Sequence, residues 1–333
     1  MLLLTTLISG VMITISSNSW LGAWMGLEIN LLSFIPIMSS SDNIYTTESS
    51  LKYFLIQALA LLILLFVIIS TVMMKELMLI NNYTVMSIIL STPLFLKSGA
   101  APFHWWFPSV MEGLSWMNCF ILMTVQKIAP LILISYSIKL SWFFISVILL
   151  SVMIGSIGGY NQTSIRKILT YSSINHLGWM LSSMLIGENF WLMYFLIYSM
   201  LTLSIVLIIK PFQVSFINQT FMLNNEMPIM KFLLFTSLLS LGGLPPFLGF
   251  LPKWIIIQMM VNSNMIFLIT TMVILSLITL YYYLRLSYSS FIILHSEPSW
   301  NIKTHSNSMT MTILFSCLSI SGLIMTTAVM SIY

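Results

Sequence analysis

The sequence predicts an all-α polytopic membrane protein with about eleven transmembrane helices. Of its 333 residues, 59% are hydrophobic and only 6% are charged, and apolar runs of spanning length follow one another along the chain. Two Gly/Pro-rich interruptions at one fixed spacing further predict two inverted five-helix repeats, each with a broken helix, followed by a C-terminal helix. Soluble domains carry roughly 25% charged residues. The composition therefore excludes a soluble enzyme, a nucleic-acid-binding protein and a disordered protein.

The predicted spans are apolar segments of about the 20 residues that a membrane helix needs. Met1–Trp20 contains no Lys or Arg, so we expect a retained first helix rather than a secretory signal or a transit peptide. The polar segments between spans are short, so we expect a single membrane domain over 1–333. The expected spans are 2–19, 21–39, 52–74, 84–108, 115–137, 142–160, 168–186, 190–210, 229–262, 265–288 and 309–332.

The basic residues predict the orientation of these spans. With eleven spans, the loops on the N-terminal side hold most of the Lys and Arg residues, and the opposite side has chiefly Lys75 and Lys139. The positive-inside rule then predicts an N-terminus in the cytoplasm or matrix and a C-terminus on the other side of the membrane. The basic residues on the N-terminal side are Lys52, Arg166, Lys167, Lys210, Lys231, Arg285 and Lys303.

Two of the spans carry matching interruptions. They read Lys97-Ser-Gly-Ala-Ala-Pro-Phe-His-Trp-Trp-Phe-Pro108 and Leu241-Gly-Gly-Leu-Pro-Pro-Phe-Leu-Gly-Phe-Leu-Pro252, and four positions align at a constant offset of 144 residues. Because proline lacks an N–H and clashes with the preceding turn, we expect both helices to be broken, over 84–108 and over 229–262. The offset predicts a first repeat over 1–137, an inverted second repeat over 142–294 and a terminal helix over 309–332.

Ionisable residues inside the expected spans are the candidate functional residues. A Lys or Glu at the bilayer centre costs about 2.5–3.5 kcal/mol to insert, so we expect each to have a compensating role. Simpler alternatives stay open: Lys52 and Lys253 reach an interface, Lys97 and Lys127 form a purely structural pairing with Glu28, and His176 is a core histidine with a satisfied ring. The candidates are Glu28, Lys52, Lys97, Lys127, His176 and Lys253.

This set of residues favours movement of protons or small cations. A buried lysine releases its proton more readily than an exposed one, and a nearby carboxylate favours the protonated form. A row of such groups can therefore pass a proton where water bridges them. We expect no Arg within the membrane, and Asp is confined to the loop at Asp42, so no larger organic substrate is indicated. The two cysteines, Cys119 and Cys317, lie in separate apolar runs and form neither a CxxC motif nor a cluster site.

Several motifs follow one another in an order that resembles a known family. They are Trp24-Met-Gly-Leu-Glu-Ile-Asn30, Glu48-Ser-Ser-Leu-Lys-Tyr-Phe54, Leu96-Lys-Ser-Gly-Ala-Ala-Pro-Phe-His104, Gln126-Lys-Ile-Ala-Pro130, Asn161-Gln-Thr-Ser-Ile-Arg-Lys-Ile168, Ser172-Ser-Ile-Asn-His-Leu-Gly-Trp179 and Gly242-Gly-Leu-Pro-Pro-Phe-Leu-Gly-Phe-Leu-Pro-Lys253. From the first span to about Arg285, the chain resembles the mitochondrially encoded antiporter-like chain 2 of NADH–ubiquinone oxidoreductase, respiratory complex I. The 27 Met residues and the scarcity of charge are similar to an invertebrate form.

The resemblance implies a proton-pumping module and a role for each candidate. Glu28 matches the glutamate that pairs with Lys97, the lysine of the first broken helix. Lys52 matches the lysine of the next helix, Lys127 the connecting lysine and Lys253 the lysine of the second broken helix. His176 matches a histidine on the hydrophilic axis that connects them. We therefore expect a catalytic row for proton translocation made of Glu28, Lys52, Lys97, Lys127, His176 and Lys253.

The resemblance also implies a setting. We expect a multi-pass protein of the mitochondrial inner membrane, with the N-terminus in the matrix and the C-terminus in the intermembrane space. Its partners would be phospholipids and other complex I membrane subunits, including neighbouring antiporter-like and small membrane subunits, and no nucleic acid. FMN, the iron–sulfur clusters and ubiquinone would belong to other subunits, so we expect no cofactor and no metal in this chain.

Two alternative functions stay open. A subunit of a cation/proton antiporter would share this helix plan and would show Na⁺-dependent transport. A scaffold subunit would use its buried charges only to hold helices together. In that case, neutralising Lys97 or Lys127 would harm assembly but leave turnover intact.

Overall fold

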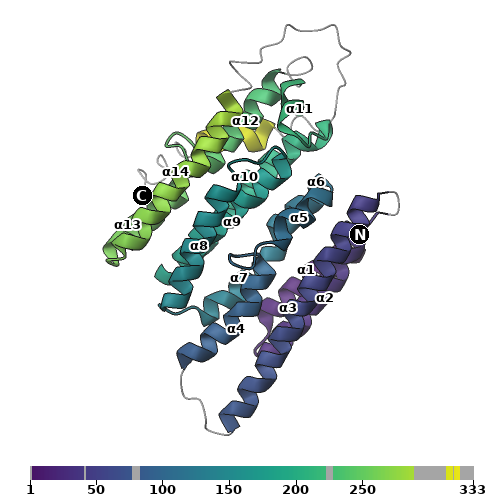
Figure 1. Ribbon diagram of the computed structural model, residues 1–333, viewed down its shortest axis with the longest axis vertical. Helices are drawn as coiled ribbons and strands as arrows, with labels where there is room; N and C mark the ends of the chain where they lie inside the picture. The colour runs from purple at the N-terminus through teal and green to yellow at the C-terminus, as the bar shows by residue number, and fades with distance from the viewer. Residues whose placement is uncertain are drawn as a thin grey trace. The chain divides into compact units, whose positions relative to one another are not determined.

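The computed structural model describes residues 2–40, 43–76, 83–222, 228–288, 313–317 and 319–322. Within these residues the chain is almost entirely helical, as predicted (Figure 1). The described part contains no strand beyond an isolated bridge between Ser164 and Phe216. Of the predicted C-terminal helix over 309–332, only 313–317 and 319–322 are described, and both pieces are helical. The rest of that prediction lies outside the described residues.

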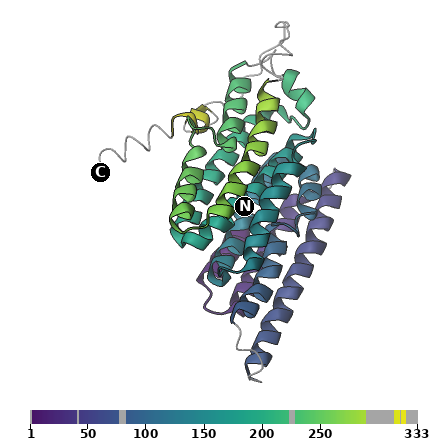
Figure 2. The ribbon, with the colours of Figure 1, turned by 60° about the vertical axis from the view of Figure 1, so that its left-hand side comes forward.

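The chain divides into two compact units, Met1–Ser151 and Val152–Tyr333. In the first unit, α1 packs on α2, α2 on α3, α3 on α4 and α5, and α7 on α1, α4 and α6. Figure 2 shows the ribbon of Figure 1 turned by 60° about the vertical axis. The unit contains α1 (Leu2–Ser16), α2 (Trp20–Met38), α3 (Ile44–Glu76), α4 (Tyr83–Ser98), α5 (Trp106–Gly113), α6 (Trp116–Met123), α7 (Val125–Ser137) and the first part of α8 (Trp142–Gly158).

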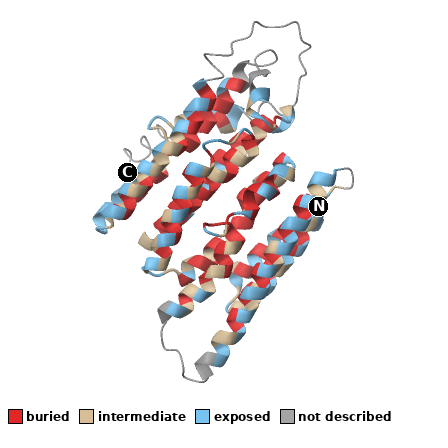
Figure 3. Ribbon diagram, viewed as in Figure 1, coloured by how far each residue is buried: buried red, intermediate tan, exposed pale blue. Residues whose placement is uncertain are grey.

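The second unit is organised around α9 and α10. In this unit α10 packs on α9, α12 and α13, while α14 packs on α9, α12 and α13. Figure 3 shows that α9 is buried along most of its length. The unit contains α9 (Ile165–Ile186), α10 (Glu188–Ile209), a 3₁₀ turn (Lys210–Phe212), α11 (Ile217–Met222), α12 (Pro228–Gly242), α13 (Phe250–Asn262) and α14 (Ile266–Tyr288).

Five helical stretches of the described chain are long and apolar enough to cross a membrane: Trp20–Met38, Ile44–Met73, Trp116–Ser137, Glu188–Phe212 and Ile266–Tyr288. Shorter apolar helices, such as α1 and α8, accompany them. Their outward surfaces are rich in large apolar side chains, for example Leu62 and Phe66 on α3. This is the surface expected of a chain surrounded by lipid or by other membrane helices. The predicted count of eleven spans stays a prediction.

The third span begins earlier than the sequence predicts. We expected it to start at 52, after a polar segment, but α3 begins at Ile44. The hydroxyls of Thr46, Thr47, Ser49 and Ser50 each donate to the carbonyl three residues earlier, at 2.7–2.9 Å. Because these bonds satisfy the hydroxyls within the helix, a polar segment continues the helix instead of ending it.

Both predicted breaks are present as interruptions of the helix. The first separates α4 from α5 and the second separates α12 from α13. Each begins at a glycine with positive φ, Gly99 at 76° and Gly243 at 85°, a backbone conformation that favours glycine. The Ala101–Pro102 peptide in the first break is cis.

The 144-residue spacing extends beyond the two glycines. Helix α4 ends at Ser98 and α12 at Gly242, while α5 begins at Trp106 and α13 at Phe250. The same offset relates the first residues of α3 and α10, Ile44 and Glu188. The predicted repeat boundary between 137 and 142 stays a prediction, since the division into compact units falls inside α8.

A further interruption was not predicted. The span predicted over 115–137 is present as one apolar stretch, Trp116–Ser137, but within it α6 ends at Met123 and α7 begins at Val125. Thr124 between them has φ −117° and ψ −75°, and its hydroxyl donates to the Phe120 carbonyl at 2.7 Å. A threonine that bonds back to the preceding turn bends helices. The interruption gives α7 its own first turn, and this turn carries Gln126 and Lys127.

Candidate functional site

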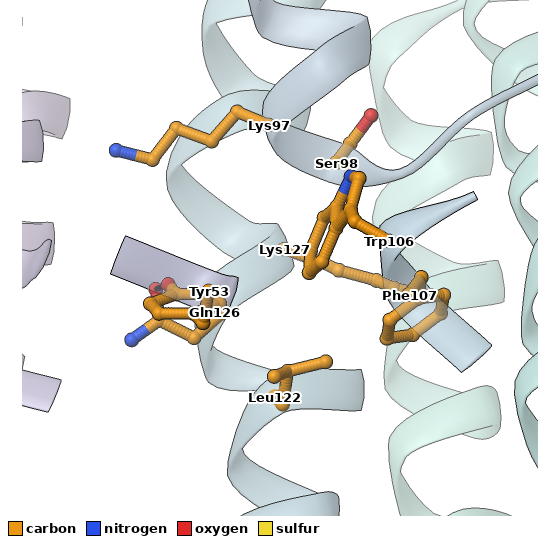
Figure 4. A pocket seen from close by; sticks show the side chains of 8 residues that line it. All are labelled: Tyr53, Lys97, Ser98, Trp106, Phe107, Leu122, Gln126 and Lys127. Carbon is orange, nitrogen blue, oxygen red and sulfur yellow. Dashed lines mark hydrogen bonds between the residues drawn. The ribbon is translucent and has the colours of Figure 1, made fainter. Parts of the chain in front are cut away.

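Three helix ends of the first unit meet around a cavity. Its wall comes from the last turn of α4, the start of α5 and the start of α7, with Tyr53 added from α3 (Figure 4). The cavity is small, with a volume of about 10 Å³, roughly the space for one water molecule, and its lining includes Lys97, Trp106, Gln126 and Lys127. Two of the predicted site residues therefore share one cavity, because a helix interruption lies next to each of them.

Lys97 is buried, with 6% of its surface exposed. Its ammonium donates to the Leu27 carbonyl on α2 at 3.1 Å. Glu28, the next residue on α2, interacts electrostatically with Lys97. Among the described residues, however, no ion pair within 4.0 Å joins the two. Lys97 thus reaches the segment that carries Glu28, but it contacts the backbone instead of the carboxylate.

Lys127 is the most deeply buried lysine of the candidate set, with 2% exposed. Its ammonium lies 5.0 Å from the centroid of the Phe107 ring. A cation over an aromatic face is stabilised by the ring quadrupole, and more so where water is excluded. Phe107 belongs to the first turns of α5. The cation therefore comes from α7, which begins after the interruption at Thr124, and the ring that faces it comes from α5, which begins after the first break.

Amide and hydroxyl side chains adjoin the two lysines. The Gln126 amide donates to Asn30 Oδ1 at 2.8 Å, and the Tyr53 hydroxyl donates to Gln126 Oε1 at 3.3 Å. The Gln57 amide donates to the Lys97 carbonyl at 3.3 Å. Our sequence reasoning assigned none of these four residues to the site. Their signal in the sequence is a polar amide or phenol within a span of otherwise apolar residues.

Lys52 is not brought into this cavity. Its side chain is 48% exposed, and it pairs at 2.6 Å with Glu48, which lies one turn earlier on α3 and is 57% exposed. The early start of α3 creates this pair, because it places both residues on one helical face. In the isolated chain, Lys52 therefore lies on the surface.

In the second unit, Lys253 packs against the second break. Its ammonium donates to the Gly242 carbonyl, the last residue of α12, at 2.8 Å. A side chain added at Gly243 would have its Cβ only 3.1 Å from the Lys253 ammonium. The Trp179 ring of α9 lies 5.9 Å from the same ammonium. Glycine at 243 thus provides both the left-handed turn and the space that Lys253 fills.

His176 lies one turn before Trp179 on α9 and is buried. Its Nδ1 forms a 2.7 Å hydrogen bond with the Tyr194 hydroxyl of α10. The Tyr198 ring lies 5.1 Å from the imidazole. The histidine is therefore satisfied by a tyrosine that can give or take a proton.

These groups can exchange protons but do not form a metal site. Each unit holds buried lysine, together with hydroxyl or amide neighbours and, in the second unit, an imidazole. Across the part of the chain that the structure describes, no three His, Cys, Asp or Glu side chains gather closely enough to hold a metal ion. The arrangement is suited to accepting, holding and releasing protons in a water-poor interior.

Known proteins resemble this chain closely. The family model described as NADH:quinone oxidoreductase/Mrp antiporter, transmembrane, matches residues 17–279. NADH-ubiquinone oxidoreductase chain 2 of Anopheles gambiae is 56% identical over 327 residues, covering 97% of this chain and 95% of the relative. The protein of the same name from Loxodonta africana is 39% identical and covers 93% of this chain and 92% of the relative.

Solved structures share the fold at lower identity. A chain of respiratory complex I from Thermus thermophilus superposes with a TM-score of 0.84 at 23% identity, covering 97% of this chain and 77% of that chain. A chain of the Mrp complex from Dietzia sp. superposes with a TM-score of 0.75 at 17% identity, covering 91% and 62% respectively. The helix plan is therefore shared well beyond the range of close sequence similarity.

Proposed function

The chain belongs to the chain 2 family of NADH-ubiquinone oxidoreductase, within the NADH:quinone oxidoreductase/Mrp antiporter membrane proteins, and from this premise we propose how it works. It is a core membrane subunit of the proton-pumping complex I of the mitochondrial inner membrane. It translocates protons along its buried charged residues, and redox chemistry in other subunits drives the movement.

The observation that carries this proposal is the cavity shared by Lys97 and Lys127. Each lysine costs about 2.5–3.5 kcal/mol to place inside a membrane. An apolar side chain would fill the same space without this cost, so packing alone does not explain either lysine. Two such groups beside one cavity, with amides and a phenol around it, are what a relay of protons through water requires.

The two inverted five-helix repeats are part of the proposal. The recurrence of helix ends and of left-handed glycines at one offset supports a duplicated unit. Each repeat has an odd number of spans, so consecutive copies lie upside down relative to one another. In transporters built in this way, the site lies where the matching helices are broken.

In the proposed cycle, Glu28 controls the charge of Lys97. When Glu28 approaches, its carboxylate stabilises the protonated amine, and when it withdraws, Lys97 gives its proton through water to Lys127. From there the proton moves towards His176 and Lys253 and leaves the chain. We assign Lys52 to the exposed end of the row, where a neighbouring subunit of the complex would cover it.

The rest of the proposal concerns the complex around the chain. NADH oxidation and ubiquinone reduction take place in other subunits, which hold the FMN and the iron–sulfur clusters. The partners of this chain are neighbouring membrane subunits and phospholipids. Its N-terminus faces the matrix and its C-terminus the intermembrane space, following the distribution of basic residues.

The test is Lys97→Met in inner-membrane vesicles, with NADH:ubiquinone turnover and proton pumping measured per assembled complex on a native gel. Lys139→Met is the matched control, because it removes an exposed lysine near the end of α7. We expect Lys97→Met to abolish pumping and lower coupled turnover while Lys139→Met leaves both unchanged.

Two results would contradict the proposal. Normal pumping in an assembled Lys97→Met complex would show that the buried lysines only hold helices together. Transport that depends on Na⁺ rather than on redox turnover would favour a cation/proton antiporter subunit, whose family shares the helix plan.

A further inference from the structure

A cluster of buried hydroxyl groups lies between three helices of the second unit. It contains two serines of α9, two tyrosines of α10 and two tyrosines of α14. All six side chains are at most 3% exposed. We call them the hydroxyl row, which consists of Tyr282, Tyr283, Ser172, Ser173, Tyr198 and Tyr194.

The members of the hydroxyl row follow one another through the interior of the unit. Tyr282 and Tyr283 stack edge to face with ring centroids 4.6 Å apart, and Ser172 lies close to both hydroxyls. Tyr283 interacts in turn with Tyr198, beside which Ser173 lies. Tyr198 interacts with Tyr194.

The outer end of the row opens into a second cavity. It has a volume of about 100 Å³, and Tyr282 and Arg285 line it together with the polar residues Asn161, Gln162 and Thr163. These residues come from the loop between α8 and α9 and from the last turns of α14. Arg166 and Lys167 follow in the first turn of α9. This is the end of the helices that the basic residues predict to face the matrix.

The inner end of the row is His176. Its Nδ1 shares a 2.7 Å hydrogen bond with the Tyr194 hydroxyl, and the Tyr198 ring lies 5.1 Å from the imidazole. The buried hydroxyls of the row thus lie in the same unit as the polar cavity, which Tyr282 lines, and as the imidazole of a proposed proton carrier, which Tyr194 contacts.

The row is not explained by helix packing. Within the described residues, the buried Tyr282 and Tyr283 hydroxyls make no hydrogen bond of ordinary geometry, although Ser172 and the other tyrosine lie beside each of them. Burying an unpaired hydroxyl costs about 1–3 kcal/mol on the scale of protein mutants. Phenylalanine would avoid that cost at nearly the same volume. Buried polar groups without a protein partner are normally satisfied by ordered water.

The two serines of the hydroxyl row can donate and accept hydrogen bonds at the same time. The Ser172 hydroxyl donates to the Leu169 carbonyl at 2.9 Å, and the Ser173 hydroxyl donates to the Thr170 carbonyl at 2.7 Å. A hydroxyl has one donor and two acceptor lone pairs. Each serine oxygen can therefore accept a hydrogen bond from the tyrosine beside it, Ser172 from Tyr282 or Tyr283 and Ser173 from Tyr198.

We propose that the cavity beside Arg285 and the hydroxyl row form the path by which His176 takes up protons from the aqueous phase. A proton on water in the cavity is passed inwards: each oxygen gains a proton from the outer side and releases one to the inner side. The last O–H bond to break is that of Tyr194, and the new N–H bond forms on His176 while Tyr194 regains a proton from the row. Nothing is oxidised or reduced. This inference rests on the proposed function.

The chain offers a matched pair of variants to test the path. Tyr282→Phe removes the hydroxyl at the mouth of the row, whereas Tyr281→Phe removes one from the exposed neighbour, which stacks on Tyr160. We expect Tyr282→Phe to lower pumping and coupled turnover per assembled complex by about fivefold, the rate equivalent of one lost hydrogen bond. The loss should deepen as the pH rises, because proton uptake becomes limiting. Tyr281→Phe should match the unaltered complex.

The outcomes separate this inference from the proposed function. If Tyr282→Phe pumps normally at every pH while Lys97→Met does not pump, the path is wrong and the proposed function stands. If Lys97→Met pumps normally, the proposed function itself fails. Should Tyr282→Phe prevent assembly, Ser172→Ala takes its place. An equal rate loss at every pH would indicate a packing role and overturn the path.

Discussion

The Lys97 ammonium donates a 3.1 Å hydrogen bond to the carbonyl of Leu27, the residue immediately before Glu28. A backbone carbonyl is a fixed partner, whereas the Glu28 side chain can move towards the ammonium or away from it. Lys97 is therefore held in place whether or not the carboxylate approaches. This arrangement is suited to a carrier whose charge changes while its position does not.

Glu28→Gln should lower coupled pumping per assembled complex by roughly fivefold. The amide keeps the shape of the side chain but removes about 1 kcal/mol of attraction for the protonated amine, since Glu28 is only partly buried. The measurement is the proton yield of vesicles during NADH oxidation. Glu112→Gln, at an exposed position of α5, is the control. Equal yields from the two variants would exclude a role of Glu28 in controlling Lys97.

Lys52→Met should leave assembly normal and reduce pumping. The Glu48–Lys52 pair is exposed, and such pairs contribute about 0.3–0.5 kcal/mol within a helix, so its loss does not affect the fold. A fall in proton yield at unchanged complex abundance would therefore report on the proton row. An unchanged proton yield would show that Lys52 is a surface residue with no part in proton translocation.

Alanine at the two left-handed glycines should have different effects. Both Gly99→Ala and Gly243→Ala strain the backbone by about 1–2 kcal/mol and shorten the lifetime of the complex at raised temperature. At 99 the added Cβ would be 3.5 Å from the nearest atom, an ordinary contact, but at 243 it would be 3.1 Å from the Lys253 ammonium. We expect only Gly243→Ala to lower turnover per assembled complex. Equal turnover in both variants would count against a role for the Lys253 position.

Gln126→Leu should destabilise the first unit. It removes the 2.8 Å hydrogen bond to Asn30 and leaves a buried amide oxygen unpaired, at a cost of about 1–3 kcal/mol. The half-life of the assembled complex at a fixed raised temperature measures this loss. Gln258→Leu, at an exposed position of α13, serves as the comparison and should keep the original half-life. A normal half-life for Gln126→Leu would show that Asn30 finds another partner.

The helical class and the two Gly/Pro breaks were predictable from the sequence, because glycine and proline act through local sterics that no distant residue alters. The interruption at Thr124 was not predictable in this way. Threonine is common within helices, and its bond to the Phe120 carbonyl gives no signal in the residue pattern. The start of α3 was missed for a related reason, since its hydroxyls are polar in the sequence but satisfied in the helix.

The candidate site was predictable only in part. Lys97, Lys127 and Lys253 stood out because charge is rare in this chain, and all three are buried. The exposure of Lys52 depends on how α3 packs against its neighbours, and neither composition nor spacing gives that. The polar partners Asn30, Gln57 and Tyr53 are neutral, so they carry no comparable signal. Their role follows from long-range contacts such as Gln126 with Asn30.

The placement of the two break lysines has a consequence for the direction of transport. Lys97 precedes its left-handed glycine by two residues, whereas Lys253 follows its own by ten. At the 144-residue offset the equivalents of Lys97 and Lys253 are Leu241 and Ser109, so the two breaks carry different side chains at equivalent positions. Identical halves facing opposite sides would work equally well in either direction. A lysine on opposite arms of the two breaks removes that equivalence, so in the proposed function proton entry and proton exit would meet different groups on the two sides of the membrane.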